Sequence, residues 1–104
     1  MKDKLLSFKK SENFPPNEWE SRGLNPSSEE RISQMEQVIH EFVDFLIKKN
    51  LYEINDEDFR LHQIQEWINE WDSFDFDTEE TEFIVDVMCD CMRKINFDFQ
   101  KLLI

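Results

Sequence analysis

The sequence predicts an all-α fold, a compact antiparallel bundle of three long helices preceded by one or two short helices. Three segments carry apolar residues at alternating steps of three and four, the spacing that places side chains on one helix face. Each of these segments also begins beside a residue that can cap a helix. The 104 residues include one glycine and three prolines, too few turn formers for a many-stranded sandwich or barrel.

Residues 1–26 are expected to form an N-terminal arm and connector that pack on the bundle as short helices. The stretch 1–13 has weak periodicity and predicts either a short helix or a loose arm. Pro16 at the start and Gly23 past the end favour a short helix between them. Residues 27–104 then form the acidic helical bundle, and the whole chain is expected to be a single domain.

The first long helix is predicted near residues 28–49. Ser27 and Glu30 have the spacing of a capping box directly after a proline. Two lysines near residue 49 place positive charge at the negative end of the helix dipole. The apolar stripe of this helix comprises Ile32, Met35, Ile39, Phe42 and Leu46.

Two further helices are predicted near residues 56–71 and from residue 78 to about residue 101. Asn55 is the expected cap of the first, whose stripe comprises Leu61, Ile64, Ile68 and Trp71. Asp77 and Glu80 are the expected caps of the second, whose stripe comprises Ile84, Val87, Cys91 and Ile95. The connection 72–77 alternates acids with phenylalanine, and we expect a loop because a lone strand would have no partner.

The negative charge is concentrated in one part of the chain. The sequence contains 12 Lys and Arg against 24 Asp and Glu, a formal net charge of −12. Residues 1–31 are neutral overall, whereas residues 53–90 contain fourteen acids and one base, Arg60. Such a surface repels nucleic acid and anionic lipid. We therefore expect a basic protein partner and no direct binding to nucleic acid or to a membrane.

No catalytic residue, metal ligand or cofactor is predicted, and we expect that the protein is not an enzyme. Glu36, His40 and Asp44 lie on one helix face, but they span about 12 Å and cannot share one ion. The same spacing recurs around His62, where solvated helix faces are the favoured interpretation. Cys89 and Cys91 match neither a zinc motif nor a redox motif, and we expect Cys91 to be a buried apolar residue.

Aromatic residues and acids alternate from the second long helix into the loop after it, and we predict that this region binds the partner. Binding hot spots combine aromatic anchors with a polar rim, and an acidic rim favours a cationic partner. The competing interpretation is a solvated acidic face over an ordinary core. The predicted partner-binding residues are Asp58, Glu66, Trp67, Glu70, Asp72, Phe74, Asp75, Phe76, Asp77, Glu79 and Glu80.

A cytoplasmic location is expected. The longest apolar runs are three residues, such as 45–47, so no segment is expected to span a membrane. The basic N-terminus lacks the apolar stretch of a signal peptide. Cys89 and Cys91 are too close in sequence for an ordinary disulfide, which fits a reducing compartment.

In its size, its acidity and its helix pattern, the chain resembles the bacterial immunity proteins of colicin and contact-dependent inhibition systems. The resemblance implies an inhibitor that binds and neutralises a basic toxin domain, a nuclease, by occluding its cationic cleft, as a monomer in a heterodimer. Tyr52 is the only tyrosine, so the paired-tyrosine helix of the DNase-colicin immunity family is absent and no residue roles carry over. Two alternatives are a phage-type DNA mimic or anti-CRISPR inhibitor, and an acidic helical adaptor.

Overall fold

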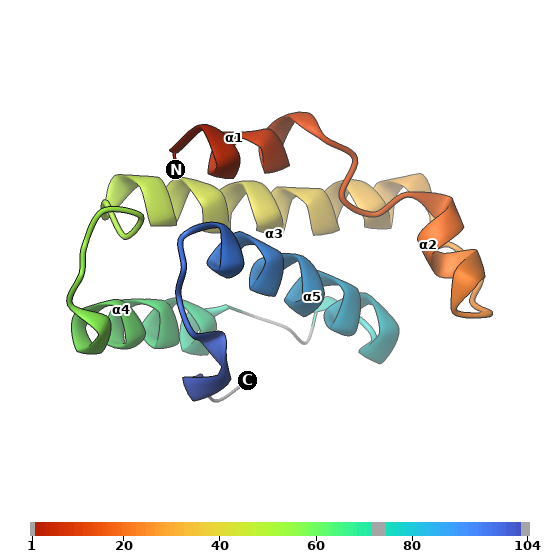
Figure 1. The fold of residues 1–104 in the computed structure, drawn as a ribbon. Coiled ribbons are helices and arrows are strands. Elements are labelled where there is room, and N and C mark those ends of the chain that lie inside the picture. The colour runs from red at the N-terminus through yellow and green to blue at the C-terminus, as the bar shows by residue number, and fades with distance from the viewer. Residues whose placement is uncertain (1, 72–74, 103–104) are drawn as a thin grey trace.

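The computed structural model describes residues 2–71 and 75–102 and confirms the all-α fold (Figure 1). The described residues contain no strand. The elements in chain order are α1 (Lys2–Lys10), α2 (Pro16–Ser21), α3 (Glu29–Lys48), α4 (Glu57–Glu70), α5 (Thr78–Lys94) and the 3-10 helix η2 (Phe99–Lys101).

Helix α3 is the central element, and the N-terminal segment packs along it. Helix α1 runs antiparallel to α3 on the side away from α4 (Figure 1). Leu5, Phe14 and Trp19 are buried in the same core as the long helices. At the surface, the ammonium of Lys9 lies 2.6 Å from a carboxylate oxygen of Asp44 on α3. The N-terminal helices therefore complete the core and are not a detached arm.

The three long helices alternate in direction, with α4 running opposite to both α3 and α5 (Figure 1). Aromatic packing joins α4 to α3, because the Trp67 ring lies 4.9 Å from Phe42 and 6.0 Å from Phe45, centroid to centroid. At the other end of α4, Arg60 is buried and donates a 2.7 Å hydrogen bond to the carbonyl of Ile95 after α5. Helix α4 is thus attached at both ends.

Two helix caps lie one residue beyond the predicted positions. Ser28, not Ser27, caps α3 and accepts from the backbone N–H of Arg31. Asp56, not Asn55, caps α4 and accepts from the backbone N–H of Phe59. In both cases neighbouring residues have equally suitable side chains, so composition alone does not decide between them.

The predicted capping box of α5 is confirmed, but the predicted end of this helix near residue 101 is wrong. Asp77 and Glu80 exchange side-chain and backbone hydrogen bonds at the start of the helix. The helix ends at Lys94, and Asn96 adopts a left-handed conformation with φ of 55°. Asparagine tolerates this conformation better than most residues do. At Asn96 the left-handed conformation turns the chain back after α5. The short helix η2 follows the turn and lies near α4 (Figure 1).

No described helix is both long and apolar enough to cross a bilayer.

Candidate partner-binding surface

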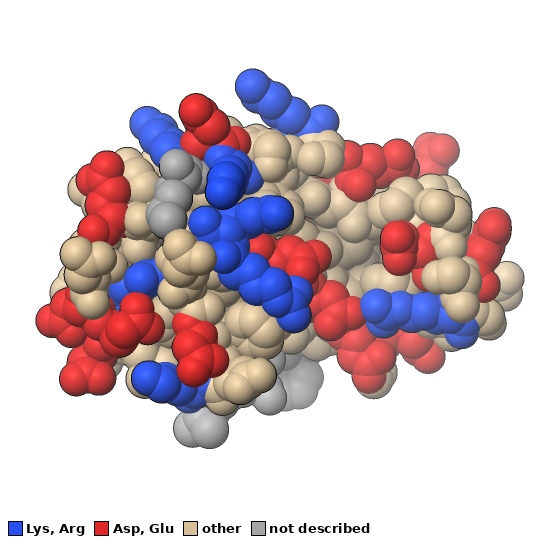
Figure 2. All heavy atoms as spheres, in the orientation of Figure 1, with Lys and Arg blue, Asp and Glu red and all other residues tan. Residues whose placement is uncertain are grey.

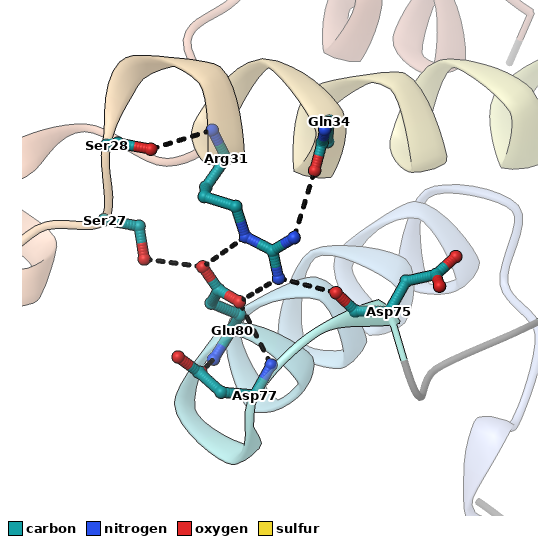
Figure 3. Close-up of polar contacts among 7 residues, drawn as sticks. All are labelled: Ser27, Ser28, Arg31, Gln34, Asp75, Asp77 and Glu80. Carbon is teal, nitrogen blue, oxygen red and sulfur yellow. Dashed lines mark hydrogen bonds and ion pairs between the residues drawn. The ribbon is translucent and has the colours of Figure 1, made fainter.

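An ion pair between α3 and α5 organises the region where the predicted site lies (Figure 3). Arg31 directs Nη2 to Glu80 Oε1 at 2.7 Å and Nε to Glu80 Oε2 at 3.3 Å. The hydroxyl of Ser27 donates to Glu80 Oε2 at 2.7 Å, and the backbone N–H of Asp77 donates to Oε1 at 3.0 Å. The buried carboxylate thus accepts hydrogen bonds from three residues.

These donors stabilise the ionised form of Glu80. The hydrogen bonds from Arg31, reinforced by those from Ser27 and Asp77, lower the pKa of Glu80 to about 2, against an opposing effect of burial. Glu80 in turn raises the pKa of Arg31. The pair is therefore charged at neutral pH, and its two charges compensate each other inside the fold.

The same arginine holds the segment that precedes α5. Its Nη2 donates a 2.6 Å hydrogen bond to the carbonyl of Asp75, and its Nη1 donates to Gln34 Oε1 at 3.2 Å. Its guanidinium also lies 5.1 Å from the centre of the Phe76 ring. Arg31 thus fixes the positions of Asp75 and Phe76 against α3, as Figure 3 shows for Asp75.

Beside this ion pair lies an open groove of about 460 Å³ between α3 and the described residues Trp71, Asp75 and Phe76, which we call the Trp71 groove. Buried Val38 contributes to its lining, and Trp71 and Phe76 are half-buried there. The indole N–H of Trp71 has no hydrogen-bond partner among the described residues. The lining residues are Arg31, Gln34, Gln37, Val38, Glu41, Trp71, Asp75 and Phe76.

A second hollow of about 260 Å³ adjoins the first and shares Glu41 and Trp71 with it. Trp67 and Glu70 line the rest of this hollow. Because Trp67 is packed against two phenylalanines of α3, its indole is held in one orientation at the surface. The two hollows together form a continuous aromatic surface with exposed carboxylates from Glu41, Glu70 and Asp75.

The outer face of α4 continues the acidic surface. Asp58, His62 and Glu66 are exposed on it, and His62 Nε2 lies 3.3 Å from a carboxylate oxygen of Glu66. Phe59 is 43% exposed and is the one exposed large apolar side chain among the described residues. An exposed aromatic ring among carboxylates has the composition of a binding anchor with a polar rim.

A family model covers residues 1–103 and is described as a domain of unknown function, DUF4844. The chain belongs to the DUF4844 family. No curated protein and no solved structure matches the sequence.

In this DUF4844 chain, the structure brings together four of the predicted partner-binding residues. Trp67, Glu70, Asp75 and Phe76 line the Trp71 groove or the adjoining hollow. Asp58 and Glu66 lie on the outer face of α4. The other described acids of the set lie at the start of α5. Asp77, the cap of this helix, and Glu79, in its first turn, are both exposed. Glu80 is only 2% exposed. The predicted residues Asp72 and Phe74 lie outside the described residues.

Glu80 has an internal role in the DUF4844 fold. Its carboxylate is occupied by hydrogen bonds from Ser27, Arg31 and Asp77, so it stabilises the site and is not presented to a partner. The sequence signals only its place in the capping box. The pairing with Arg31 depends on tertiary structure and has no local pattern.

Sequence reasoning also missed the contribution of α3 to the site. Glu41, Gln34 and Gln37 lie on a helix whose apolar stripe predicted only core packing. The only sequence feature that could have indicated this contribution is the row of polar residues beside the apolar stripe of α3. Nothing in the sequence shows that this flank, rather than another, faces the residues after α4.

A further acidic groove of about 320 Å³ lies between the N-terminal segment and α5. Arg22 lies 4.2 Å from the centre of the Phe83 ring, and its Nη2 is 2.8 Å from a carboxylate oxygen of Asp86. Exposed acids Glu12, Glu18 and Asp90 also line this groove. Its central apolar ring, Phe83, is covered by the chain's own Arg22 guanidinium.

The cysteines form no site. Burial raises the pKa of the Cys91 thiol to about 12 and raises that of Cys89. Both thiols are free and disfavour the thiolate. Among the described residues, no cluster of three or more His, Cys, Asp or Glu side chains has the geometry to hold a metal ion.

Proposed function

We propose that this protein is an immunity protein that binds a basic toxin domain, a nuclease, and neutralises it by covering its cationic cleft. A nuclease must hold phosphates and therefore presents a positive surface. A complementary acidic surface accelerates association with it, and buried aromatic contacts slow release. The inhibitor needs no chemistry of its own.

One observation carries the proposal: exposed carboxylates surround positioned aromatic side chains on α4 and beside it. Glu70 and Asp75 flank the half-buried rings of Trp67, Trp71 and Phe76. Binding hot spots have this composition, with aromatic anchors inside a ring of polar residues. The acidic sign of that ring selects a cationic partner.

The distribution of charge over the rest of the protein also favours approach of a cationic partner from the α4 side. On the face that Figure 2 shows, basic side chains gather over α1 and near the C-terminal end of α5, while acidic side chains gather where α4 begins and around α2. The single base of residues 53–90, Arg60, is buried. A cationic partner is therefore attracted to the α4 side and repelled from the α1 side.

The experiment is a protection assay in a bacterial host. The protein is co-expressed with each basic polypeptide encoded beside its gene, and growth is compared with expression of that polypeptide alone. The proposal expects rescue of growth from one toxic polypeptide, and loss of rescue when Glu70 and Asp75 are both changed to Lys. A matched control changes Asp3 and Glu12, which are exposed in the N-terminal segment, to Lys. Toxicity that the protein never relieves, or equal loss of rescue in both double variants, would contradict the proposal.

A further inference from the structure

We infer, resting on the proposed function, that the Trp71 groove receives an arginine side chain of the basic partner. The groove is lined by the three kinds of group that guanidinium recognition uses: an aromatic ring, carboxylates and a side-chain amide. Trp71 supplies the ring, Glu41 and Asp75 the charge, and Gln37 an amide.

The groove keeps net negative charge although Arg31 lines it. The guanidinium of Arg31 is held by Glu80 on one side and by the carbonyl of Asp75 on another. Its charge is therefore compensated inside the fold by a carboxylate that is itself buried. The exposed carboxylate of Glu41 accepts a 3.4 Å hydrogen bond from Gln37 Nε2, and that of Asp75 attracts the guanidinium of Arg31 through space. Together with Glu80, these two carboxylates outnumber the one guanidinium and determine the sign of the groove.

The size of the groove suits a side chain. Its volume of about 460 Å³ is near the lower end of the range for ligand pockets. Val38 forms an apolar patch of the lining that can pack against the methylenes of an arginine stem. Arginine is also among the residues most enriched at interface hot spots, because its planar head stacks on aromatic rings and bonds carboxylates bidentately.

Arginine is favoured over an apolar anchor for an electrostatic reason. An apolar side chain in this groove would remove water from Glu41 and Asp75 without replacing their hydrogen bonds, which costs free energy. A guanidinium replaces those bonds and gains a stacking contact with the indole. The same cost applies to an acidic side chain, with like-charge repulsion added.

The test is a titration with the blocked pentapeptide acetyl-Ala-Ala-Arg-Ala-Ala-amide, followed by the indole N–H signals in proton–nitrogen NMR spectra at low salt. The protein has three tryptophans, so each signal is assigned by a single replacement. Trp71 lines the groove, Trp67 lines the adjoining hollow, and Trp19 is 2% exposed in the core. We expect saturable shifts of the Trp71 signal, smaller shifts of the Trp67 signal, and an unmoved Trp19 signal.

Two comparisons test whether the groove recognises the positive charge of the arginine. The citrulline version of the peptide keeps the shape but loses the charge, and we expect its Kd to be at least about fivefold higher. Glu41→Gln should raise the Kd of the arginine peptide about threefold to fivefold, because it removes one rim charge. Asp3→Asn removes the same charge from α1, on the other side of α3, and should leave the Kd within a factor of about 1.5.

Equal affinities for the arginine and citrulline peptides, or equal effects of Glu41→Gln and Asp3→Asn, would overturn the inference. So would a Trp71 signal that does not move while others do. These outcomes are separate from those of the protection assay. Growth rescue without peptide binding at Trp71 would contradict the inference and leave the proposed function standing. Peptide binding at Trp71 without rescue from any toxin would contradict the proposed function and leave the groove as a site for arginine.

Discussion

Arg31 and Glu80 lie 49 residues apart in the sequence, and their side chains form an ion pair with a 2.7 Å contact between Nη2 and Oε1. The Glu80 side chain is buried, whereas the Arg31 side chain is 36% exposed. This pair joins the start of α3 to the start of α5 and holds the segment before α5 against the Trp71 groove. It is the structural support of the surface to which we assign partner binding.

The first prediction concerns this pair. Glu80→Gln should lower the free energy of unfolding by about 2–3 kcal/mol, because it removes the buried charge that Arg31, Ser27 and Asp77 satisfy. Urea denaturation at neutral pH measures the change. The control is Asp44→Asn, which breaks the exposed pair with Lys9 and should cost less than about 1 kcal/mol. Equal costs for the two variants would mean that burial of Glu80 contributes nothing.

The second prediction is the pH dependence of that contribution. The pKa of Glu80 is lowered from 4.5 to about 2 in the folded protein, so its ionised form stabilises the fold fully above pH 4.5. The contribution is lost as the pH falls toward 2. The difference in unfolding free energy between the wild-type protein and Glu80→Gln should therefore shrink from pH 5 to pH 2.5. Because both proteins contain the other carboxylates, the effects of those groups on the unfolding free energy cancel in this difference. A difference that stays constant from pH 5 to pH 2.5 would contradict the lowered pKa of Glu80.

The third prediction concerns the core. Replacing Ile39, Phe42 or Ile84 by Ala should cost about 2–5 kcal/mol, since each side chain is fully buried among the long helices. Thermal unfolding followed by circular dichroism at 222 nm should be cooperative for the wild-type protein. The exposed residue His62 serves as the control, and His62→Ala should cost less than about 0.5 kcal/mol. Costs this small at all three core positions would show that the apolar stripes are misassigned.

The fourth prediction concerns the two thiols. Cys89 is partly exposed and Cys91 is fully buried, and burial raises the pKa of Cys91 to about 12. A thiol-specific reagent at pH 8 should therefore modify Cys89 first and reach Cys91 only on unfolding. Cys89→Ser should abolish the early reaction, while Cys91→Ala should keep it. Rapid modification of both thiols in the folded protein would contradict the described packing of α5.

How much of this could be predicted from sequence depends on whether the determinant is local. The stripes of α3, α4 and α5 are local periodicities, and they predicted all three helices. The caps of α3 and α4 differ by one residue from the prediction. At α3, Ser27 and Ser28 are both competent caps, and the hydroxyl of Ser27 binds Glu80 instead. The end of α5 was missed because the left-handed conformation of Asn96 follows from how the chain returns to α4.

The candidate site was predicted only in part, for the same reason. The acidic and aromatic composition of residues 58–80 is visible in the sequence. It predicted a partner-binding role for Trp67, Glu70, Asp75 and Phe76. The burial of Glu80 requires a partner from α3, and the contribution of Glu41 requires knowing which flank of α3 faces α4. Neither contact has a sequence signature, because both join residues that are distant in the chain.

Two classes of variant should affect the complex differently, which provides a fifth prediction. Glu70→Lys should mainly slow association with the proposed basic toxin and reduce the dependence of that rate on salt, because exposed rim charges act through long-range attraction. Phe59→Ala should instead speed dissociation, because it removes an exposed aromatic anchor, and the exposure of this ring means that the fold is little affected. Lys10→Glu on the exposed end of α1 is the control and should leave both rates nearly unchanged.

The most direct test of the central claim is the association rate of the purified protein with the proposed toxin domain, measured at 50 and 300 mM salt. An acidic surface that attracts a cationic cleft predicts an association rate at least about tenfold higher at the lower salt concentration. The charge-reversed variant Glu70→Lys should show a clearly smaller ratio. An association rate that is the same at both salt concentrations, and unaffected by Glu70→Lys, would contradict binding through this acidic surface.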